Sequence, residues 1–236
     1  VPKILEKQTP AGHWEGDAHY YGRKFVGTHW SMILLPELAA DPDDPRLKRG
    51  VDFMLAATAK NYMLEDDFDK TVPSPQEYGF TCLWGNILRY AAYAGCADDP
   101  RLLPIIEYVA RNVETGACHC KMNAYLPCAW GTARVLWGLA ALPSRSPVVE
   151  GAIQTGLDFL LDSAYHLTAG DYPTRGEPHA LWAKLSFPLF YQADILFILR
   201  LLAELKMLKH PAAQPALAWL ADQRQPNGRW RGVNPF

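Results

Sequence analysis

The chain has 236 residues, 49% of them hydrophobic, and a formal net charge of −2 from 23 basic and 25 acidic side chains. This composition predicts one globular domain over residues 1–236 and argues against disorder, and the absence of a dense Lys/Arg run argues against nucleic acid as a partner. Even the most apolar segment, 187–205, contains charged residues, so we expect no membrane-spanning helix and leave peripheral membrane contact open. The five cysteines are crowded rather than spaced as a disulfide framework, which favours a cytoplasmic location.

Amphipathic helices are expected at regular intervals along the chain. The segment DDPRL occurs at 43–47 and again at 98–102, and after the second copy apolar residues follow the spacing of a one-faced helix. Looser copies of this helix begin near residues 146 and 210, each with an early proline, and residues 1–8 match the end of a fifth one. The sequence therefore predicts a repeat protein.

A second class of helix, more apolar and more aromatic, precedes each full amphipathic helix. The four segments of this class are THWSMILLPELA (28–39), TCLWGNILRYAAYAG (81–95), PCAWGTARVLWGLAAL (127–142) and FPLFYQADILFILRLLAEL (187–205). Their composition indicates burial on more than one face. Alternation of the two classes predicts an all-α fold of about four hairpins, with the apolar helices forming an inner wall and the amphipathic helices an outer layer.

Two segments that follow outer helices share a further pattern. Residues 8–14 (QTPAGHW) carry Gln8, Gly12 and Trp14 in the spacing Q-x3-G-x-W, and residues 220–230 (LADQRQPNGRW) match it with one extra residue after Gln223. This pattern resembles the QW motif of the squalene-hopene cyclase and protein prenyltransferase superfamily, and the chain is most similar to bacterial stand-alone proteins with such repeats. The resemblance implies an α/α toroid, here with too few hairpins for a closed ring.

The expected functional face is the end of the fold where the inner helices begin. Long connections lead into these helices, at about 59–77, 114–126 and 163–186, and the positive ends of the helix dipoles converge there. The resemblance implies an isoprenoid ligand, whose diphosphate would lie near the helix amino-termini and one of the basic residues Arg23, Lys24, Lys121, Arg175 or Lys184. Its apolar tail would contact the aromatic residues Trp30, Trp84, Trp130, Phe187, Phe190 and Tyr191. The alternative is that these aromatic side chains fill a solid core.

Cysteines recur at one structural position. Alignment of the inner segments places Cys82 over Cys128, both at helix starts, where the thiol pKa is lowered. The loop before Cys128 contributes Cys118, His119 and Cys120, so a tetrahedral zinc site formed by Cys82, Cys128 and one or two of these three residues is a hypothesis. The resemblance to prenyltransferases also implies zinc at this end. The spacing of the cluster is not a standard zinc motif, and small buried cysteines are the alternative.

Acidic residues supply candidates for acid catalysis. Asp66, Asp67 and Asp69 cluster in a long loop with the order D-D-x-D, whereas the resemblance to squalene-hopene cyclases implies a proton-donating Asp in D-x-D-D. A solvated acidic loop and a Mg²⁺ site for a diphosphate are the alternatives. Asp194 lies within an apolar inner segment, where a carboxyl group faces the cavity or pairs with a neighbour.

Three functions follow from these observations. The first is an isoprenoid-binding or isoprenoid-transforming protein of the cyclase and prenyltransferase type, with Asp194 or the cluster Asp66–Asp69 as catalytic acids. The second is a non-catalytic helical-repeat scaffold that binds a protein partner or its own copy. The third is a zinc-dependent transferase or hydrolase that uses the cysteine cluster.

Overall fold

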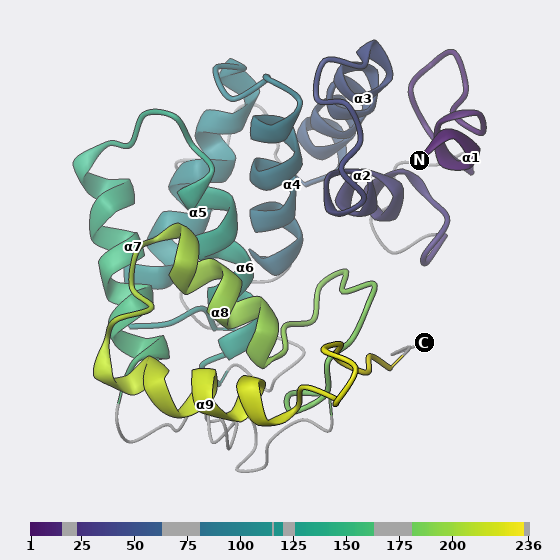
Figure 1. Ribbon diagram of the computed structural model, residues 1–236. Coiled ribbons are helices and arrows are strands. Elements are labelled where there is room, and N and C mark those ends of the chain that lie inside the picture. Colours follow the sequence, from purple (N-terminus) through teal and green to yellow (C-terminus); the bar gives the residue numbers. More distant parts are fainter. Residues whose placement is uncertain (16–22, 63–80, 115, 120–125, 163–180, 234–236) are drawn as a thin grey trace.

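The computed structural model describes residues 1–15, 23–62, 81–114, 116–119, 126–162 and 181–233 (Figure 1). These residues form nine α-helices and two short 3-10 helices, and among them we find isolated β-bridges but no β-strand. The predicted all-α class is therefore confirmed for the described ranges. No described helix has the length and apolar character needed to cross a bilayer.

The helices alternate between two sets, as the sequence predicts. The even-numbered set consists of α2 (Thr28–Glu37), α4 (Thr81–Tyr93), α6 (Ala129–Ala140) and α8 (Ile195–Glu204). The odd-numbered set consists of α1 (Pro2–Leu5), α3 (Pro45–Tyr62), α5 (Leu103–Glu114), α7 (Pro147–Leu160) and α9 (Gln214–Asp222), with the 3-10 helices η1 (Pro100–Leu102) and η3 (Pro211–Ala213) before α5 and α9. Each even helix contacts the odd helix that follows it, and neighbouring even helices contact one another in chain order.

A capped proline opens each of the four odd-numbered elements that follow an even helix. The Asp44 carboxylate accepts a hydrogen bond from the backbone N–H of Arg46 at 2.9 Å, and Asp99 accepts one from Arg101 at the same distance. Ser146 caps α7 and His210 caps η3 in the same way. The predicted helix starts at the two DDPRL segments are thus confirmed, because the Asp caps the backbone and the Pro fits the first turn.

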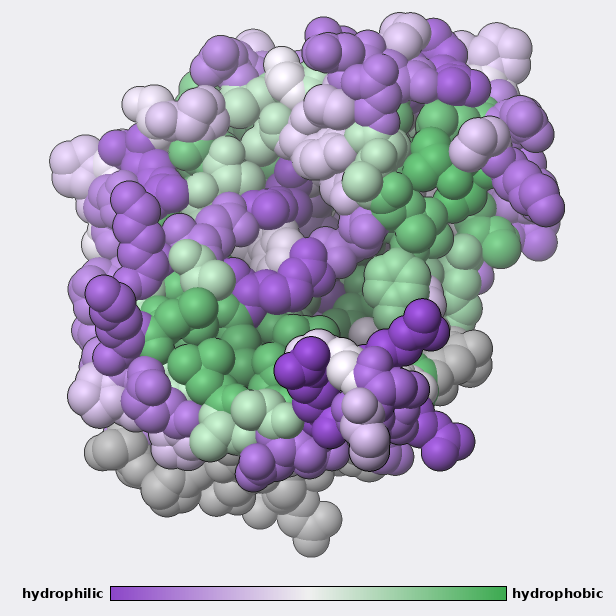
Figure 2. Space-filling model, viewed as in Figure 1, coloured by the Kyte–Doolittle hydropathy of each residue, from purple (hydrophilic) through white to green (hydrophobic). Residues whose placement is uncertain are grey.

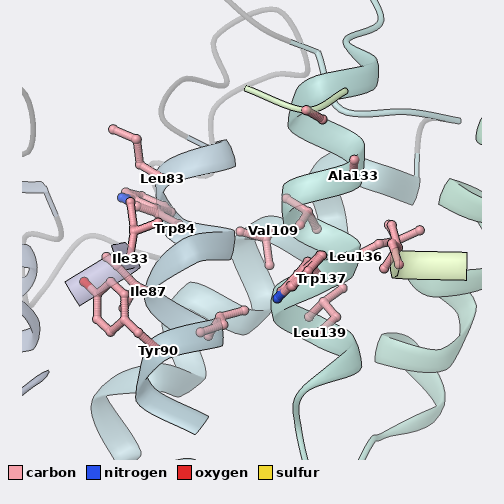
Figure 3. Packing of buried hydrophobic residues seen from close by; sticks show 14 of the residues in the cluster. Ile33, Leu83, Trp84, Ile87, Tyr90, Val109, Ala133, Leu136, Trp137 and Leu139 are labelled. Carbon is pink, nitrogen blue, oxygen red and sulfur yellow. The ribbon is translucent and has the colours of Figure 1, made fainter. Parts of the chain in front are cut away.

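Helices α4 and α6 pack with their backbones in contact. A Cβ atom at Gly85 would lie 2.5 Å from the carbonyl oxygen of Arg134, and one at Gly138 would lie 2.3 Å from the carbonyl oxygen of Gly85. Only glycine allows this approach, so the two helices lie side by side in the middle of the view (Figure 1). Figure 3 shows apolar side chains of α4 and α6 in one buried cluster with Val109 of α5.

The four even helices are also joined through their side chains. Trp137 of α6 stacks on Phe197 of α8 with ring centroids 4.2 Å apart, and the guanidinium groups of Arg89 and Arg200 each lie 4.6 Å from the Trp137 ring. Arg89 pairs with Glu204 at 2.6 Å, and Arg200 of α8 pairs with Glu37 of α2 at 2.7 Å. Figure 2 shows hydrophilic residues around a hollow near the middle of the face viewed, with apolar areas beside it.

The prediction of one continuous inner helix over 187–205 was wrong at its start. Helix α8 begins at Ile195, and residues 187–194 are not helical. The carboxylate of Asp194 accepts the backbone N–H of Phe197 at 2.8 Å and so caps the helix. Asp194, followed by an uninterrupted apolar run, marks the start of the helix. The sequence did not reveal this, because the residues before Asp194 are also apolar.

We predict that Gly85→Ala and Gly138→Ala each destabilise the protein by about 1–3 kcal/mol, because the added methyl group overlaps the backbone of the facing helix. Gly151→Ala in α7 is the matched control, since a Cβ there meets nothing within 4 Å. This control should gain about 0.5–1 kcal/mol from its better helix propensity. Chemical denaturation measures the free energy of unfolding of the three variants. Equal changes in the three variants would contradict the close contact between α4 and α6.

Candidate functional site

A tight turn connects α1 to the chain that leads into α2. The Gln8 side chain donates to the carbonyl of Gly12 at 3.0 Å, and the Trp14 indole N–H donates to the carbonyl of Ile4 at 2.7 Å. Gly12 has a φ of 92°, which favours glycine. The indole of Trp14 is thus bound to α1, whereas Gln8 bonds within the turn and to the carbonyl of Arg46 in α3 at 2.8 Å.

The same turn follows α9, with Arg224 in the place of Gln8. Arg224 Nε donates to the carbonyl of Gly228 at 3.2 Å, and the Trp230 indole donates to the carbonyl of Leu220 at 2.7 Å. Gly228 has a φ of 80°. The spacing is therefore R-x3-G-x-W without an insertion, and the assignment of Gln223 to the first position was wrong.

A third copy of the turn follows α5 and was missed in the sequence. Asn112, Gly116 and Cys118 occupy the three positions, Gly116 has a φ of 111°, and its N–H donates to the carbonyl of Val113 at 2.9 Å. In the first copy, Gly12 N–H donates to the carbonyl three residues before it at the same distance. The spacing N-x3-G-x-C was the available signal, but asparagine and cysteine replace the two residues that define the motif.

These turns hold the starts of even helices. Thr28, the first residue of α2, accepts the backbone N–H of Trp14 on its hydroxyl at 2.9 Å, and Thr132 of α6 accepts that of Cys118 at 2.9 Å. The backbone N–H of Cys128, the residue before α6, also donates to the carbonyl of Cys118 at 2.7 Å. The first and the third turn thus hold the starts of α2 and α6, close to Trp30 and Trp130.

The segment before α8 is held by buried polar side chains of α4 and α6. Asn86 donates to the carbonyl of Phe190 at 3.0 Å, and Arg134 Nε donates to the carbonyl of Gln192 at 3.0 Å. Both side chains are buried, and they lie within 3.5 Å of each other. Asn86 and Arg134 thus bind the carbonyls on either side of Tyr191. Because each buried carbonyl needs a donor, these two bonds hold the backbone at Tyr191 in place.

Aromatic side chains meet at this end of the even helices. The ring of Trp30 lies 5.2 Å from that of Phe190 and 5.9 Å from that of Tyr191, and Trp130 lies 6.4 Å from Tyr191. Trp30 and Phe190 are buried, whereas Trp130 and Tyr191 are half-buried. Four of the six predicted ligand-binding aromatic residues are thus brought into one cluster, which we call the aromatic cluster: Trp30, Trp130, Phe190 and Tyr191.

Two residues from the loop before α2 lie against the aromatic cluster: Phe25, which was not predicted, and Lys24, which was predicted as a head-group contact. Phe25 lies 5.6 Å from Trp30 and 5.2 Å from Phe190 by ring centroids, and 37% of it is exposed. It has a φ of 70°, a strained backbone for a bulky residue and a feature that often marks functional sites. The ammonium group of Lys24 lies 6.0 Å from the centre of the Tyr191 ring.

The remaining predicted ligand-binding residues lie elsewhere. Trp84 packs on Tyr108 of α5 with ring centroids 4.2 Å apart, on the side of α4 that faces an odd helix. Phe187 is 52% exposed, and its backbone N–H donates to the carbonyl of Val233 at 3.4 Å. Arg175 lies outside the described residues, as do large parts of the three long connections.

The polar groups behind the aromatic cluster carry a buried positive charge. Burial lowers the pKa of Arg134 to about 10, so its guanidinium stays charged at neutral pH, where it lies 4.0 Å from the Phe197 ring. Burial, and then the charge of Arg134, lowers the pKa of His29 to about 3. Burial, and then the nearby Cys82, raises the pKa of Tyr191. At neutral pH the Tyr191 phenol and the buried His29 imidazole are therefore uncharged, while the buried Arg134 carries a positive charge.

Asp194 has a structural role in this arrangement. Its two carboxylate oxygens accept the backbone N–H groups of Phe197 at 2.8 Å and Ser186 at 3.0 Å, and the side chain is fully buried. Burial raises its pKa, while the two hydrogen bonds and the charges of Arg134 and Arg200 act in the opposite direction. Of the two sequence interpretations, pairing with neighbours is therefore the one observed, and a catalytic role stays a prediction.

The predicted zinc ligands fall into separate roles. Cys128 caps α6 by accepting the N–H of Gly131 on its sulfur at 3.3 Å, and Cys118 is the last residue of the third turn. Cys82 is the second residue of α4, and His119 forms a β-bridge with Pro127. Within the ranges that the structure describes, no three His, Cys, Asp or Glu side chains group as metal ligands, and a zinc site needs at least three.

Cys120 lies outside the described residues, so the zinc hypothesis stays a prediction. The same holds for Asp66, Asp67 and Asp69 and for the Mg²⁺ site proposed for them.

Comparisons with known proteins gave no match: no family model fits the chain, and no curated protein or solved structure is significantly similar to it.

We predict that His29 stays neutral far into the acid range. Because its folded pKa of about 3 lies below the unfolded value of 6.5, its contribution to stability is present above pH 6.5 and is lost as the pH falls toward 3. NMR of the imidazole should show the neutral form at about pH 5. The stability of the protein relative to His29→Gln should fall over the same range, and a protonated imidazole at that pH would contradict the burial.

We also predict the pH dependence of Asp194→Asn. The folded pKa of Asp194 is raised, so its contribution to stability is present below the unfolded pKa and is lost as the pH rises through the folded pKa. Asparagine can still cap the helix but does not titrate. The melting temperature of the wild type minus that of the variant should therefore fall as the pH rises above the ordinary pKa of an Asp carboxyl, about 3.9. A difference that stays constant or rises would contradict the account.

Proposed function

We propose that the protein binds an isoprenoid-type ligand, an apolar chain with an anionic head group, at the aromatic cluster. The observation that carries this proposal is the convergence of Trp30, Trp130, Phe190 and Tyr191 where the even helices begin. Two of the four rings are half-buried and Phe25 beside them is 37% exposed, so apolar aromatic surface remains open to a ligand. Binding there would remove this surface from water.

The charge at this end of the fold supports an anionic head group. Lys24 lies 6.0 Å from the Tyr191 ring, and helices α2, α4 and α6 begin here with backbone N–H groups at their first turns. The buried charge of Arg134 adds to the positive potential. A diphosphate near Lys24 with its chain along Tyr191 and Trp130 is the pose that these features favour.

We propose further that the four hairpins form an open α/α toroid, with the even helices on the inside. The order of helix contacts and the three copies of the turn support this arrangement. The ion pairs of Arg89 with Glu204 and of Arg200 with Glu37 draw the even helices together, and the Trp137–Phe197 stack lies between α6 and α8. A ligand would accordingly enter from the end that carries the aromatic cluster.

Binding of a saturated isoprenoid diphosphate analogue, followed by tryptophan fluorescence and calorimetry, tests the proposal. Tyr191→Ala and Trp130→Ala should each weaken binding by about tenfold or more, because each removes aromatic contact with the chain. Trp230→Ala is the matched control, since Trp230 is 45% exposed in the turn after α9 and should leave the affinity unchanged. Equal losses in all three variants, or no binding by the wild type, would contradict the site.

Lys24→Ala separates the head group from the chain. This variant should weaken binding of the diphosphate by about tenfold and leave binding of the corresponding alcohol unchanged, since only the diphosphate offers a partner for the ammonium group. A loss of equal size for both ligands would place the head group elsewhere.

A further inference from the structure

The turn after α5 and the residues just before α6 lie side by side as two antiparallel segments. His119 forms a β-bridge with Pro127, and in the neighbouring pair the backbone N–H of Cys128 donates to the carbonyl of Cys118 at 2.7 Å. Residues opposite each other in such a pair have Cα atoms about 5.5 Å apart, and their side chains share one face. A disulfide spans Cα separations of about 4.4–6.8 Å. The two cysteines are therefore spaced for a covalent bond.

Both cysteine side chains converge on Gly131 in the first turn of α6. A Cβ atom at Gly131 would lie 3.1 Å from the Cβ of Cys118 and 3.6 Å from that of Cys128. The sulfur of Cys128 would lie 3.6 Å from the same atom, and it accepts the backbone N–H of Gly131 at 3.3 Å. Because glycine has no side chain, the two cysteine side chains occupy the space beside its Cα.

Neither cysteine needs a sulfur atom for its place in the backbone. Cys118 is the last residue of its turn, where the other two copies carry tryptophan, and its N–H is bound by Thr132. Cys128 caps α6, a position that serine, threonine, aspartate and asparagine fill best. The backbone roles thus leave the pairing of two thiols at this point unexplained.

The two thiols differ in their access to solvent. Both are reduced in the structure, and Cys118 is 1% exposed whereas Cys128 is 9% exposed. A small oxidant therefore reaches the sulfur of Cys128 first. Two other described cysteines belong to different elements, since Cys82 is the second residue of α4 and Cys96 lies between α4 and η1.

We propose that Cys118 and Cys128 are a redox-sensitive pair that a peroxide converts into a reversible disulfide. The peroxide oxidises the Cys128 thiol to a sulfenic acid, and one water leaves. The Cys118 thiol then attacks this sulfur, the S–S bond forms, and the sulfenic oxygen leaves as a second water. Two electrons and two protons thus pass from the thiols to the peroxide. Exchange with a thiol reductant restores both cysteines.

The disulfide would join the turn after α5 to the residue that caps α6. It closes a short loop and so restricts the unfolded chain, which stabilises the folded protein. The start of α6 is then held covalently, two residues before Trp130 of the aromatic cluster. Oxidation would therefore make this end of the fold more rigid.

The first test identifies the bond in full-length Cys120→Ser. The protein is treated with hydrogen peroxide, alkylated, and digested with trypsin without reduction. Cleavage after Arg111, Lys121 and Arg134 places Cys118 and Cys128 in separate peptides, 112–121 and 122–134, each then with one cysteine. We expect these two peptides to be joined as the main disulfide product and to separate with dithiothreitol. Unlinked peptides, or a main link from either cysteine to Cys82 or Cys96, would overturn the proposal.

The second test measures stability in the same Cys120→Ser background. Oxidation should raise the melting temperature by several degrees, and added Cys118→Ala or Cys128→Ser should abolish this shift. Serine at position 128 can still cap α6, so the reduced variant should stay folded. Added Cys96→Ser is the matched control and should keep the shift. No shift in the parent, or an equal shift in all the variants, would overturn the proposal. Neither test uses an isoprenoid ligand, so this proposal and the proposed function fail independently.

Discussion

The backbone contact between α4 and α6 is the constraint on which the candidate site depends. Gly85 and Gly138 let the two helices approach until main-chain atoms touch. At this separation Asn86 and Arg134 bind neighbouring stretches of one segment, at the carbonyls of Phe190 and Gln192. That segment carries Phe190 and Tyr191 to the tryptophans of α2 and α6. Two glycines in the core therefore position aromatic side chains at the end of the fold.

Main-chain hydrogen bonds explain how one turn serves three places with different residues. In all three copies the glycine N–H donates to the carbonyl three residues before it, and this bond does not depend on the residue at the first position. The side chains of Gln8 and Arg224 add a bond to the glycine carbonyl in the first and last copies. The last position of the turn is Trp14 in the first copy, Cys118 in the copy after α5 and Trp230 in the copy after α9. A cysteine in place of tryptophan after α5 lies beside the start of α6, so part of the cysteine cluster follows from the repeat itself.

The helical hairpins could be predicted because they rest on local patterns: apolar periodicity, and an Asp before a Pro. The aromatic cluster was predicted in part: its four members were among the six aromatic residues expected to contact a ligand, whereas Trp84, which aligns with Trp130 in sequence, packs on Tyr108 instead. The start of α8 could not be predicted, because residues 187–194 are as apolar as a buried helix and are held by Asn86 and Arg134, distant in sequence. Phe25 was missed because its contacts depend on a strained backbone that no periodicity encodes.

The central claim is that the aromatic cluster is preorganised to receive an apolar chain with an anionic head. A crystal structure of the protein grown with a saturated isoprenoid diphosphate tests this most directly. The account predicts density for the chain against Trp130 and Tyr191 and for the diphosphate near Lys24, with Asn86 and Arg134 still bound to the segment before α8. Density for the ligand at another place, or no ligand density at the aromatic cluster at saturating ligand, would contradict it.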